Sequence, residues 1–551
     1  MKLLAFISFI SAVFAYLPSQ QTQAAEVSVH LKLISPQMLE VAYQLPQTCD
    51  AIPFLNQGNL LKFGTGIRSA WQATDDCGTA DGSTLRKINK ACTSIRFHIP
   101  ATSKFYDRVS PGSFPMGEGI YAHTSNYAIS DKCGAVGYQF SAPGSIAFKS
   151  RVSRHAASYD DYDGQYMAVL LLQKQISSEA GAISYFNPAL GTENSQLLQE
   201  ISDQAIDFYH KGLPDIAFRK PIIAATVEQN GGALNFWGDA GDILRLALYN
   251  WPQHPTPGTD ARLRKFVWHE FAHRFQPPPT KENGQSAPFI VEGGAEYLRW
   301  TASVKTRWVS PEEAATELST AISNCISKAG DYSWKALPDN MLNSGAMPYE
   351  CGLALHVLGL AVRQNDASPL QQINDYYQVL NTRDTTIFEQ AMECGTKKDC
   401  TPHWLPRLLG DQAMSTVWPD FLASTELAKP APPPPSQHLN IQRMALASLM
   451  EENCNGDVSF YTDKDVFTIG EIKACKVFRE GMKIIQMEGK NISGPLLLVD
   501  EMTQACLSRG NVSLGLHSGE TIAVPCKRAF KIPQFYAVDM KRLMQKLDLY
   551  L

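Results

Sequence analysis

The sequence Val267-Trp268-His269-Glu270-Phe271-Ala272-His273 places two histidines four residues apart, with a glutamate directly after the first. Residues four positions apart lie on one face of a helix, so His269 and His273 can offer imidazole nitrogens to a single metal ion. Glu270 is then placed to act as a base toward water bound to that metal. Glu292 follows His273 after eighteen intervening residues and can return on a second helix as a third, anionic ligand.

Three protein ligands leave one zinc position for water, which is the arrangement of a catalytic site and not of a structural one. The sequence therefore predicts one Zn2+ ion bound by His269, His273 and Glu292, with Glu270 as the catalytic base. The alternative is a surface helix with two solvated histidines, and the spacing of Glu292 argues against it. Glu296 lies one turn beyond Glu292, and we expect it to accept the outer N–H of a ligating histidine unless it is a solvated surface glutamate.

The length and composition of the chain set its broad class. A chain of 551 residues is too long for one hydrophobic core and is expected to divide into roughly two to four domains. The hydrophobic content of 44% and the charged content of 19% are ordinary for a soluble globular protein. The net charge of −5 argues against a nucleic-acid partner.

The N-terminus has the pattern of a secretory signal over residues 1–25. Lys2 supplies a positive charge, residues 3–17 form an apolar run, and Ala24 and Ala25 offer a cleavage point. The apolar run is short for a membrane span, and no other stretch is long and apolar enough to cross a bilayer. We therefore expect a secreted or periplasmic protein with no stable membrane insertion after signal removal.

The cysteine pattern agrees with export. The twelve cysteines form three groups of four along the chain, which predicts disulfides closed within domains in an oxidising compartment. A cysteine-based zinc site is the alternative, but the sequence has no C-x-x-C pair. The pairing inside each group stays open at this point, although Cys394 and Cys400 would close a natural short loop. The groups are Cys49, Cys77, Cys92, Cys133; Cys325, Cys351, Cys394, Cys400; and Cys454, Cys475, Cys506, Cys526.

Hydrophobic periodicity predicts a multi-domain α+β protein. Residues 26–155 read as a β-rich N-terminal domain, because they contain alternating apolar runs separated by glycine- and proline-rich turns. Residues 156–428 combine buried-strand patterns with helices and carry the metal motif. A proline-rich stretch at 429–436 is expected to be a stiff linker, followed by a small β domain at 437–551.

Two further motifs make the metal region resemble the gluzincin metallopeptidases of the aminopeptidase N superfamily. Val291-Glu292-Gly293-Gly294-Ala295-Glu296-Tyr297 is similar to their N-E-G-F-A-x-Y run, which carries the third ligand. Met347-Pro348-Tyr349-Glu350-Cys351-Gly352 is similar to their P-Y-E-K-G segment. The resemblance implies a thermolysin-like zinc peptidase domain, with a small mixed sheet and a helical part. It also implies that the Tyr349 hydroxyl stabilises the oxyanion of the tetrahedral intermediate.

One segment departs from this family. Asn230-Gly231-Gly232-Ala233-Leu234-Asn235 resembles the family's G-x-M-E-N strand, which lines the substrate and binds its free amine through a glutamate. Leu234 occupies the glutamate position, and an apolar side chain cannot balance a substrate ammonium. Gly231, Gly232, Ala233, Leu234 and Asn235 are still expected to bind substrate backbone as an edge strand.

The order of the predicted domains resembles the glycyl aminopeptidase family, whose members end in a PDZ domain. The run from Phe478 to Lys490 is similar to the PDZ pattern G-D-x-I-x-x-I-N-G. Its carboxylate-binding loop has no clear counterpart, and Asn455-Gly456-Asp457-Val458 matches it only weakly. The C-terminal domain is thus predicted to be PDZ-like, with a peptide as an expected partner if that loop is functional.

The predicted function is an exported zinc peptidase with peptide or protein substrates. It would be either an aminopeptidase of altered specificity or an endopeptidase, since the amine-binding glutamate is missing. The alternative is a catalytically idle PDZ-containing binding protein on a peptidase scaffold. The enzyme is favoured because the ligands, the base and the tyrosine are all retained.

Overall fold

The structure is a computed structural model of the 551-residue chain. It describes residues 26–551 apart from 56–65, 104–112, 160–166, 173–176, 179–181, 217–219, 230–233, 241–242, 277–286, 343–345, 364–367, 383–387, 395–396, 398–399, 455–457, 464–465, 473, 493–495, 531, 548 and 550–551. The predicted signal peptide, residues 230–233 of the predicted substrate strand and residues 455–457 of the expected carboxylate-binding loop lie outside the described residues.

The chain forms two compact units. The first contains residues up to 199 together with 220–256, and the second contains 200–219 and 257–551. This division is coarser than the one expected from the sequence, whose finer boundaries stay a prediction. Within the described residues, no helix combines the length and apolar character that a bilayer crossing requires.

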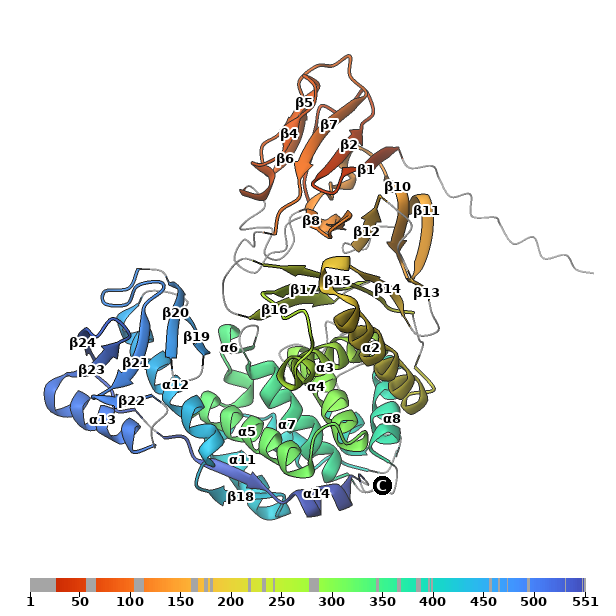
Figure 1. Ribbon diagram of the computed structural model, residues 1–551. Coiled ribbons are helices and arrows are strands. Elements are labelled where there is room, and N and C mark those ends of the chain that lie inside the picture. Colours follow the sequence, from red (N-terminus) through yellow and green to blue (C-terminus); the bar gives the residue numbers. More distant parts are fainter. Residues whose placement is uncertain are drawn as a thin grey trace, which may run out of the picture. The chain divides into compact units, whose positions relative to one another are not determined.

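The first unit begins with a nine-stranded sheet, as the alternating sequence predicts (Figure 1). Buried residues alternate with less buried neighbours along β1 and along β2 as far as Val41, so this hairpin mainly buries one face. The sheet continues to β12, beyond residue 155 where the sequence suggested a boundary. Its strands are β1 (Val27–Ser35), β2 (Met38–Gln44), β4 (Gln72–Ala73), β7 (Ser94–Pro100), β8 (Ser113–Pro115), β9 (Gly119–His123), β10 (Val136–Phe148), β11 (Arg151–Tyr159) and β12 (Met167–Leu171); β3 (Ala51–Pro53), β5 (Gly78–Ala80) and β6 (Thr84–Lys87) form a separate small sheet.

A five-stranded mixed sheet completes the first unit. Its order is β13 (Ser177–Ser178), β14 (Ile183–Phe186), β15 (Ile222–Glu228), β17 (Ile243–Tyr249) and β16 (Asn235–Ala240). β14, β15 and β17 run parallel, whereas β16 pairs antiparallel with β17 at the edge of the sheet. Both large sheets bury apolar side chains in one shared core that includes Tyr121, Val169 and Ile222.

Helix α2 (Thr192–Gly212) follows β14 and carries the chain into the second unit. The second unit is helical up to residue 425, and several of its helices begin with proline at the first turn, where the missing N–H costs nothing. Ser310 and Glu313 form a capping box at the start of α5. The helices are α3 (Pro257–Ala272), α4 (Ala287–Lys305), α5 (Pro311–Ala329), α6 (Asp339–Leu342), α7 (Met347–Ala361), α8 (Pro369–Thr382), α9 (Phe388–Cys394), α10 (Leu405–Leu408) and α11 (Met414–Thr425).

The C-terminal part of the second unit is built on its own apolar core. Its elements are α12 (Pro435–Asn453), β19 (Val458–Asp463), β20 (Val466–Ile472), β21 (Lys483–Met487), β22 (Lys490–Asn491), α13 (Leu497–Arg509), β23 (Asn511–Leu516), β24 (Thr521–Pro525), β25 (Phe535–Val538) and α14 (Met540–Lys546).

The segment at 429–436, which was expected to be a stiff linker, takes part in regular secondary structure. Strand β18 (Ala428–Ala431) pairs with β25, and Pro435 is the first residue of α12. The backbone of β25 also binds α5, because the amides of Tyr536 and Val538 donate to the hydroxyls of Ser323 and Ser319 at 2.9 and 3.0 Å. The end of the chain is thus anchored to a helix of the metal region.

All six disulfides of the structure lie within the predicted groups. The pairs are Cys49–Cys133, Cys77–Cys92, Cys325–Cys351, Cys394–Cys400, Cys454–Cys475 and Cys506–Cys526. The expectation of pairing within groups is confirmed, and so is the short Cys394–Cys400 loop.

Candidate metal centre and active site

The two histidines of the motif lie at the C-terminal end of α3. His269 is in the last turn of the helix, and His273 begins the 3-10 turn His273–Phe275 that continues it. Their Nε2 atoms are 3.2 Å apart, and the two rings are nearly perpendicular. The later part of α2 packs on α3, where the Tyr209 hydroxyl donates to the backbone oxygen of Trp268 at 2.8 Å.

Glu292 joins the two histidines from the second turn of α4. Its Oε2 lies 3.2 Å from Nε2 of His269 and 3.6 Å from Nε2 of His273. Ligand atoms of a tetrahedral zinc, each about 2.0–2.1 Å from the metal, are roughly 3.4 Å from one another. The three donor atoms therefore have the mutual spacing of zinc ligands.

The outer nitrogens of both histidines face hydrogen-bond acceptors. Nδ1 of His269 lies 2.9 Å from Oε1 of Glu296, and Nδ1 of His273 lies 2.7 Å from Oε1 of Gln276. When each Nδ1 carries its proton, both Nε2 atoms present lone pairs. Two acceptor nitrogens 3.2 Å apart repel each other unless a cation lies between them, so the residues fit a zinc ion.

A buried chain of charges supports this arrangement. Arg299, whose side chain is 2% exposed, bridges Glu296 on its own helix and Glu317 on α5, and Lys265 of α3 binds Glu317 at 3.0 Å. Burial acts to raise the pKa of Glu296, but Arg299 and His269 outweigh it and hold that pKa well below its usual range. Glu296 is thus an anion that can accept the His269 proton.

The charges at the metal donors are strongly coupled. Burial acts to raise the pKa of Glu292, but its contacts with His269 and His273 lower that pKa to about 2. Burial acts to lower the pKa of His269, but contacts with Glu292 and Glu296 raise it to about 10 in the metal-free protein. The donor set therefore attracts a positive charge, either a proton or a metal ion.

The predicted base and the predicted tyrosine both lie beside this donor set. The charge of Glu270 acts on His269 and on Tyr349, raising the pKa of each. The ring of Tyr349, in the first turn of α7, has its centroid 5.5 Å from that of His269. Burial, followed by the charges of Glu292 and Glu270, raises the pKa of Tyr349 above its usual range. Its hydroxyl thus stays protonated and able to donate a hydrogen bond.

The first turn of α7 is held by two neighbouring helices at three consecutive positions. Glu350 binds Asn324 Nδ2 at 2.7 Å and forms an ion pair with Lys328, both on α5. Cys351 is bonded to Cys325 of α5. Gly352 faces Gly293 of α4 so closely that a Cβ on either residue would lie 2.4 Å or less from the other backbone. These contacts explain why the motifs carry glycine at 293 and 352.

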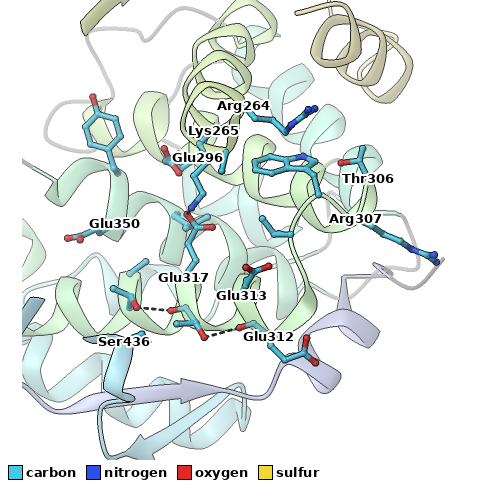
Figure 2. A pocket seen from close by; sticks show the side chains of 18 of the residues that line it. Arg264, Lys265, Glu296, Thr306, Arg307, Glu312, Glu313, Glu317, Glu350 and Ser436 are labelled. Carbon is cyan, nitrogen blue, oxygen red and sulfur yellow. Dashed lines mark hydrogen bonds and ion pairs between the residues drawn. The ribbon is translucent and has the colours of Figure 1, made fainter. Parts of the chain in front are cut away.

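A cavity of about 1100 Å³ adjoins the site (Figure 2). Pockets that hold small molecules usually measure about 300–1,000 Å³, so this one can admit a segment of peptide. It is bounded by α3, α5, the start of α7 and the loop after α4, and its lining includes Glu296, Tyr349 and Glu350. The cavity meets the candidate site at Glu296 and Tyr349, whereas its lining does not include His269, His273 or Glu292.

The predicted substrate strand is described only in part. Leu234 is half-buried, and Asn235 begins the edge strand β16 in the first unit. An edge position leaves backbone groups available for pairing, and the binding of substrate backbone by this strand stays a prediction. Gly231, Gly232 and Ala233 lie outside the described residues.

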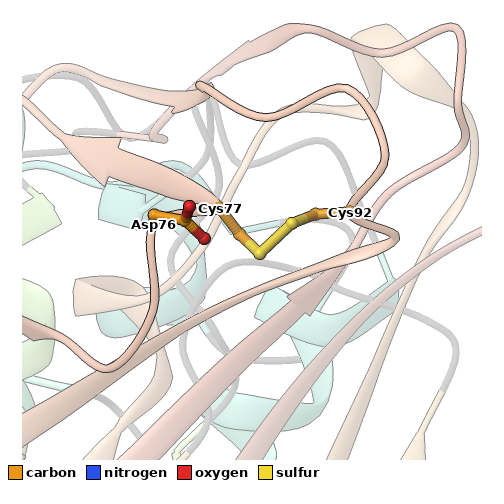
Figure 3. A group of neighbouring side chains, drawn as sticks. All are labelled: Asp76, Cys77 and Cys92. Atoms are coloured by element: carbon orange, nitrogen blue, oxygen red, sulfur yellow. A yellow bond between two sulfur atoms is a disulfide. The ribbon is translucent and has the colours of Figure 1, made fainter.

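A second group of metal-ligand side chains occurs in the first unit. Asp76, Cys77 and Cys92 lie together, but the two sulfur atoms are bonded to each other (Figure 3). A disulfide offers no thiolate to a metal, so this group is structural.

Several supporting residues were not predicted from the sequence. Arg299 lies three residues after Glu296, a spacing that places both on one helix face and could have signalled the pair. Gln276 follows His273 by three residues, but this spacing alone is a weaker sequence signal. The other contacts of Gln276 come from two other helices, which the sequence does not show. Glu317 and Lys328 meet their partners only through helix packing.

No protein-family model matches this chain, and no curated protein matches its sequence. Among solved structures it is similar to an aminopeptidase N family protein from Idiomarina loihiensis, with a TM-score of 0.59 and 11% identity over 95% of this chain and 100% of that one. It also matches leukotriene A4 hydrolase from Saccharomyces cerevisiae (TM-score 0.38, 12% identity, 78% and 72% covered) and an M1 zinc metallopeptidase from Deinococcus radiodurans (TM-score 0.33, 12% identity, 67% and 90% covered).

The first of these similarities shows the fold. The predicted resemblance to the aminopeptidase N superfamily is confirmed at that level, whereas neither the PDZ-like domain nor the glycyl aminopeptidase layout finds support in the matches. The chain thus has a fold like that of an aminopeptidase N family protein, and this fold carries a His-His-Glu set of metal donors.

Proposed function

We propose that the protein is an exported zinc-dependent peptidase that hydrolyses peptide bonds. The observation that carries this proposal is the convergence of His269, His273 and Glu292 at zinc-ligand spacing beside Glu270 and Tyr349. The similarity in fold to an aminopeptidase N family protein supports the same reaction class.

The residues divide the chemistry among them. A zinc ion held by the three donors would acidify a water molecule and polarise the substrate carbonyl. Glu270 would accept a proton during attack on that carbonyl and return it to the leaving amine. Tyr349, kept protonated by burial and by neighbouring carboxylates, would donate a hydrogen bond to the oxygen on which negative charge develops. Glu296 and Gln276 would hold the two histidines in their ligating orientation.

Substrate recognition is proposed to differ from that of an aminopeptidase. Leu234 stands where the resembling motif has the glutamate that binds a free amine. An ammonium group gains nothing from an apolar side chain, so the site has no reason to require a free N-terminus. We expect internal or blocked peptide bonds to be accepted, which makes the enzyme an endopeptidase or one of altered specificity.

Export is proposed from two features. Residues 1–25 have the sequence pattern of a secretory signal, and the structure carries six disulfides. Disulfides persist in oxidising compartments, so a secreted or periplasmic location is favoured.

The deciding experiment compares the wild-type protein with the Glu270→Gln variant on N-acetylated and free-N-terminus peptides. Losing the base should lower kcat about 10²–10⁴-fold on both substrates while the zinc content stays at one per chain. Glu480→Gln removes an exposed glutamate of the C-terminal part and should leave activity unchanged.

Equal activity of Glu270→Gln and wild type at equal zinc content would overturn the mechanism. Cleavage of free-N-terminus peptides alone would keep the peptidase but overturn the proposed specificity.

A further inference from the structure

The side chain of Gln276 contacts three groups around the second histidine. Its Oε1 lies 2.7 Å from Nδ1 of His273. Its Nε2 lies 2.9 Å from the backbone oxygen of Val291 and 3.1 Å from the hydroxyl of Tyr377. The three groups come from the turn after α3, from α4 and from α8, so Gln276 joins three separate elements.

These contacts determine which end of the amide faces the histidine. A backbone carbonyl can only accept a hydrogen bond, so the atom beside Val291 O must be the NH2 group. The oxygen of the amide therefore points to His273, and it can only accept. In the neutral imidazole, Nδ1 of His273 then carries the single proton, and the lone pair of Nε2 faces the other metal donors.

Space for this amide comes from Gly294 on α4. A Cβ at residue 294 would lie 2.4 Å from Nε2 of Gln276 and 2.9 Å from the hydroxyl of Tyr377. Real side chains do not approach so closely, so any larger residue would displace the amide. The resembling N-E-G-F-A-x-Y run has phenylalanine at this position, and this chain has glycine. Glycine at position 294 thus leaves the space that the Gln276 amide occupies.

The first histidine is supported differently. Nδ1 of His269 faces the carboxylate of Glu296, which Arg299 holds as an anion. Nδ1 of His273 faces a neutral amide whose orientation is set by a carbonyl and a phenol. Both partners can accept the Nδ1 proton, but only the amide does so without adding negative charge beside the ring.

We propose that Gln276 is a positioning residue that holds His273 in the Nδ1–H tautomer and so prepares its Nε2 for zinc. Gly294 and Tyr377 keep the amide in place. The inference rests on the proposed zinc site, and it concerns metal affinity instead of the reaction. Losing an outer-shell partner of a metal ligand typically weakens metal binding about 10–100-fold.

The test measures zinc binding directly. Metal-free protein, prepared with a chelator, is titrated with zinc against a chromogenic competitor, for wild type, Gln276→Leu and Gly294→Ala. Gln276→Leu should weaken zinc binding about 10–100-fold, since Nδ1 of His273 loses its acceptor. Gly294→Ala retains Gln276 but displaces it, and should weaken binding in the same direction.

Two controls make the result interpretable. Gln371→Leu removes an exposed glutamine from α8, the helix that carries Tyr377, and should leave zinc affinity unchanged. Thermal unfolding of each metal-free variant shows whether it folds. If Gln276→Leu does not fold, the zinc affinity of Gly294→Ala tests the inference, because alanine favours a helix and this variant is expected to fold.

Wild-type zinc binding with unchanged affinity in both Gln276→Leu and Gly294→Ala would overturn this inference and leave the proposed function standing. A wild-type protein that binds no zinc would overturn the metal site and the role of Gln276 together.

Discussion

The candidate site has two halves that are held by different forces. The ligand half, on α3 and α4, places its donors through hydrogen bonds and ion pairs that lead from His269 to Glu296, Arg299 and Glu317. The tyrosine half, on α7, is held against α5 and α4 by a disulfide, an ion pair and a contact between two glycines. The ligand half depends on charge alone, whereas the tyrosine half adds a covalent bond and a steric contact to its ion pair.

The difference follows from what each half must do. Metal donors need a defined protonation state, and buried charges with fixed partners provide it. Tyr349 mainly needs a position, because a phenol is already protonated at neutral pH and burial with the nearby carboxylates raises its pKa further. Disturbing charge should therefore affect metal binding, and disturbing contact should affect turnover.

The largest effect is expected from Arg299→Met. This change leaves Glu296 and Glu317 facing each other without their shared cation, and breaking a buried ion pair in this way costs about 3–5 kcal/mol. Urea unfolding of the metal-free protein measures that cost. Zinc affinity should fall as well, since Glu296 loses the partner that fixes it beside His269.

Arg307→Met is the matched control, because Arg307 is exposed and follows the same helix. Its stability should change by no more than about 0.5 kcal/mol. An Arg299→Met protein as stable as wild type would show that charge does not hold the ligand half together.

A somewhat smaller effect is expected from the double replacement Cys325→Ala/Cys351→Ala. The disulfide closes a separation of 26 residues, which corresponds to about 3.5 kcal/mol of unfolding free energy. The bond ties Cys351, two residues after Tyr349, to α5, so its loss should let Tyr349 shift. A misplacement of about 1 Å costs roughly 100-fold, and kcat should fall by up to that factor. Zinc affinity should stay at the wild-type value, which equilibrium titration can show.

Cys77→Ala/Cys92→Ala is the control for this variant, because it removes a disulfide of the first unit. That disulfide spans 15 residues, which corresponds to about 3 kcal/mol of unfolding free energy. The control should lose stability without losing kcat. Tyr349→Phe removes the hydroxyl itself, so it gives the largest loss of kcat expected from the tyrosine half, about 10²–10³-fold. Equal losses of kcat in the two disulfide variants would mean that the bond to Cys325 does not position Tyr349.

The smallest expected effect is a pH dependence of stability, which should differ between the tyrosine half and the ligand half. Burial lowers the pKa of His356, on α7, to about 4. The unfolded chain binds this proton near pH 6.5 and the folded chain only near pH 4, so stability falls as the pH is lowered between these values, by at most about 3 kcal/mol. His356→Leu should remove this loss in urea unfolding of the metal-free protein.

The ligand half responds in other pH ranges. The pKa of Glu292 is lowered to about 2, so its contribution is lost only as pH falls from about 4.5 toward 2. The pKa of His269 is raised to about 10, so its contribution is complete below pH 6.5 and is lost as pH rises toward 10. A wild-type protein with constant stability between pH 6.5 and 4 would contradict the assignment for His356.

Sequence analysis predicted those parts of the site whose residues lie at a recognisable spacing along the chain. The four-residue spacing of His269 and His273 requires only a helix, and Glu296 follows Glu292 by one helical turn. Glu292 was predicted from its spacing, and the structure brings it to the histidines. The grouping of cysteines along the chain likewise predicted pairing within groups, because disulfides tend to close within one domain, and the short Cys394–Cys400 loop follows from sequence proximity.

The parts that could not be predicted depend on contacts between distant segments. The proline-rich stretch at 429–436 was expected to be an extended linker, yet β18 finds a partner strand more than a hundred residues later. The PDZ interpretation of residues 478–490 followed a short pattern of apolar residues, which many small β structures share. Neither outcome is encoded in a local window.

The sequence by itself determined the chemistry available to this protein: two imidazoles, a carboxylate ligand, a base and a tyrosine, with leucine where a related motif has an amine-binding glutamate. Only the tertiary structure decided how these groups are controlled. Gln276 reaches His273 because Gly294 leaves room for it, and Arg299 meets Glu317 because α4 packs on α5. The physical reason is that a residue's type sets what it can donate or accept, whereas its protonation and aim depend on neighbours that only packing brings together.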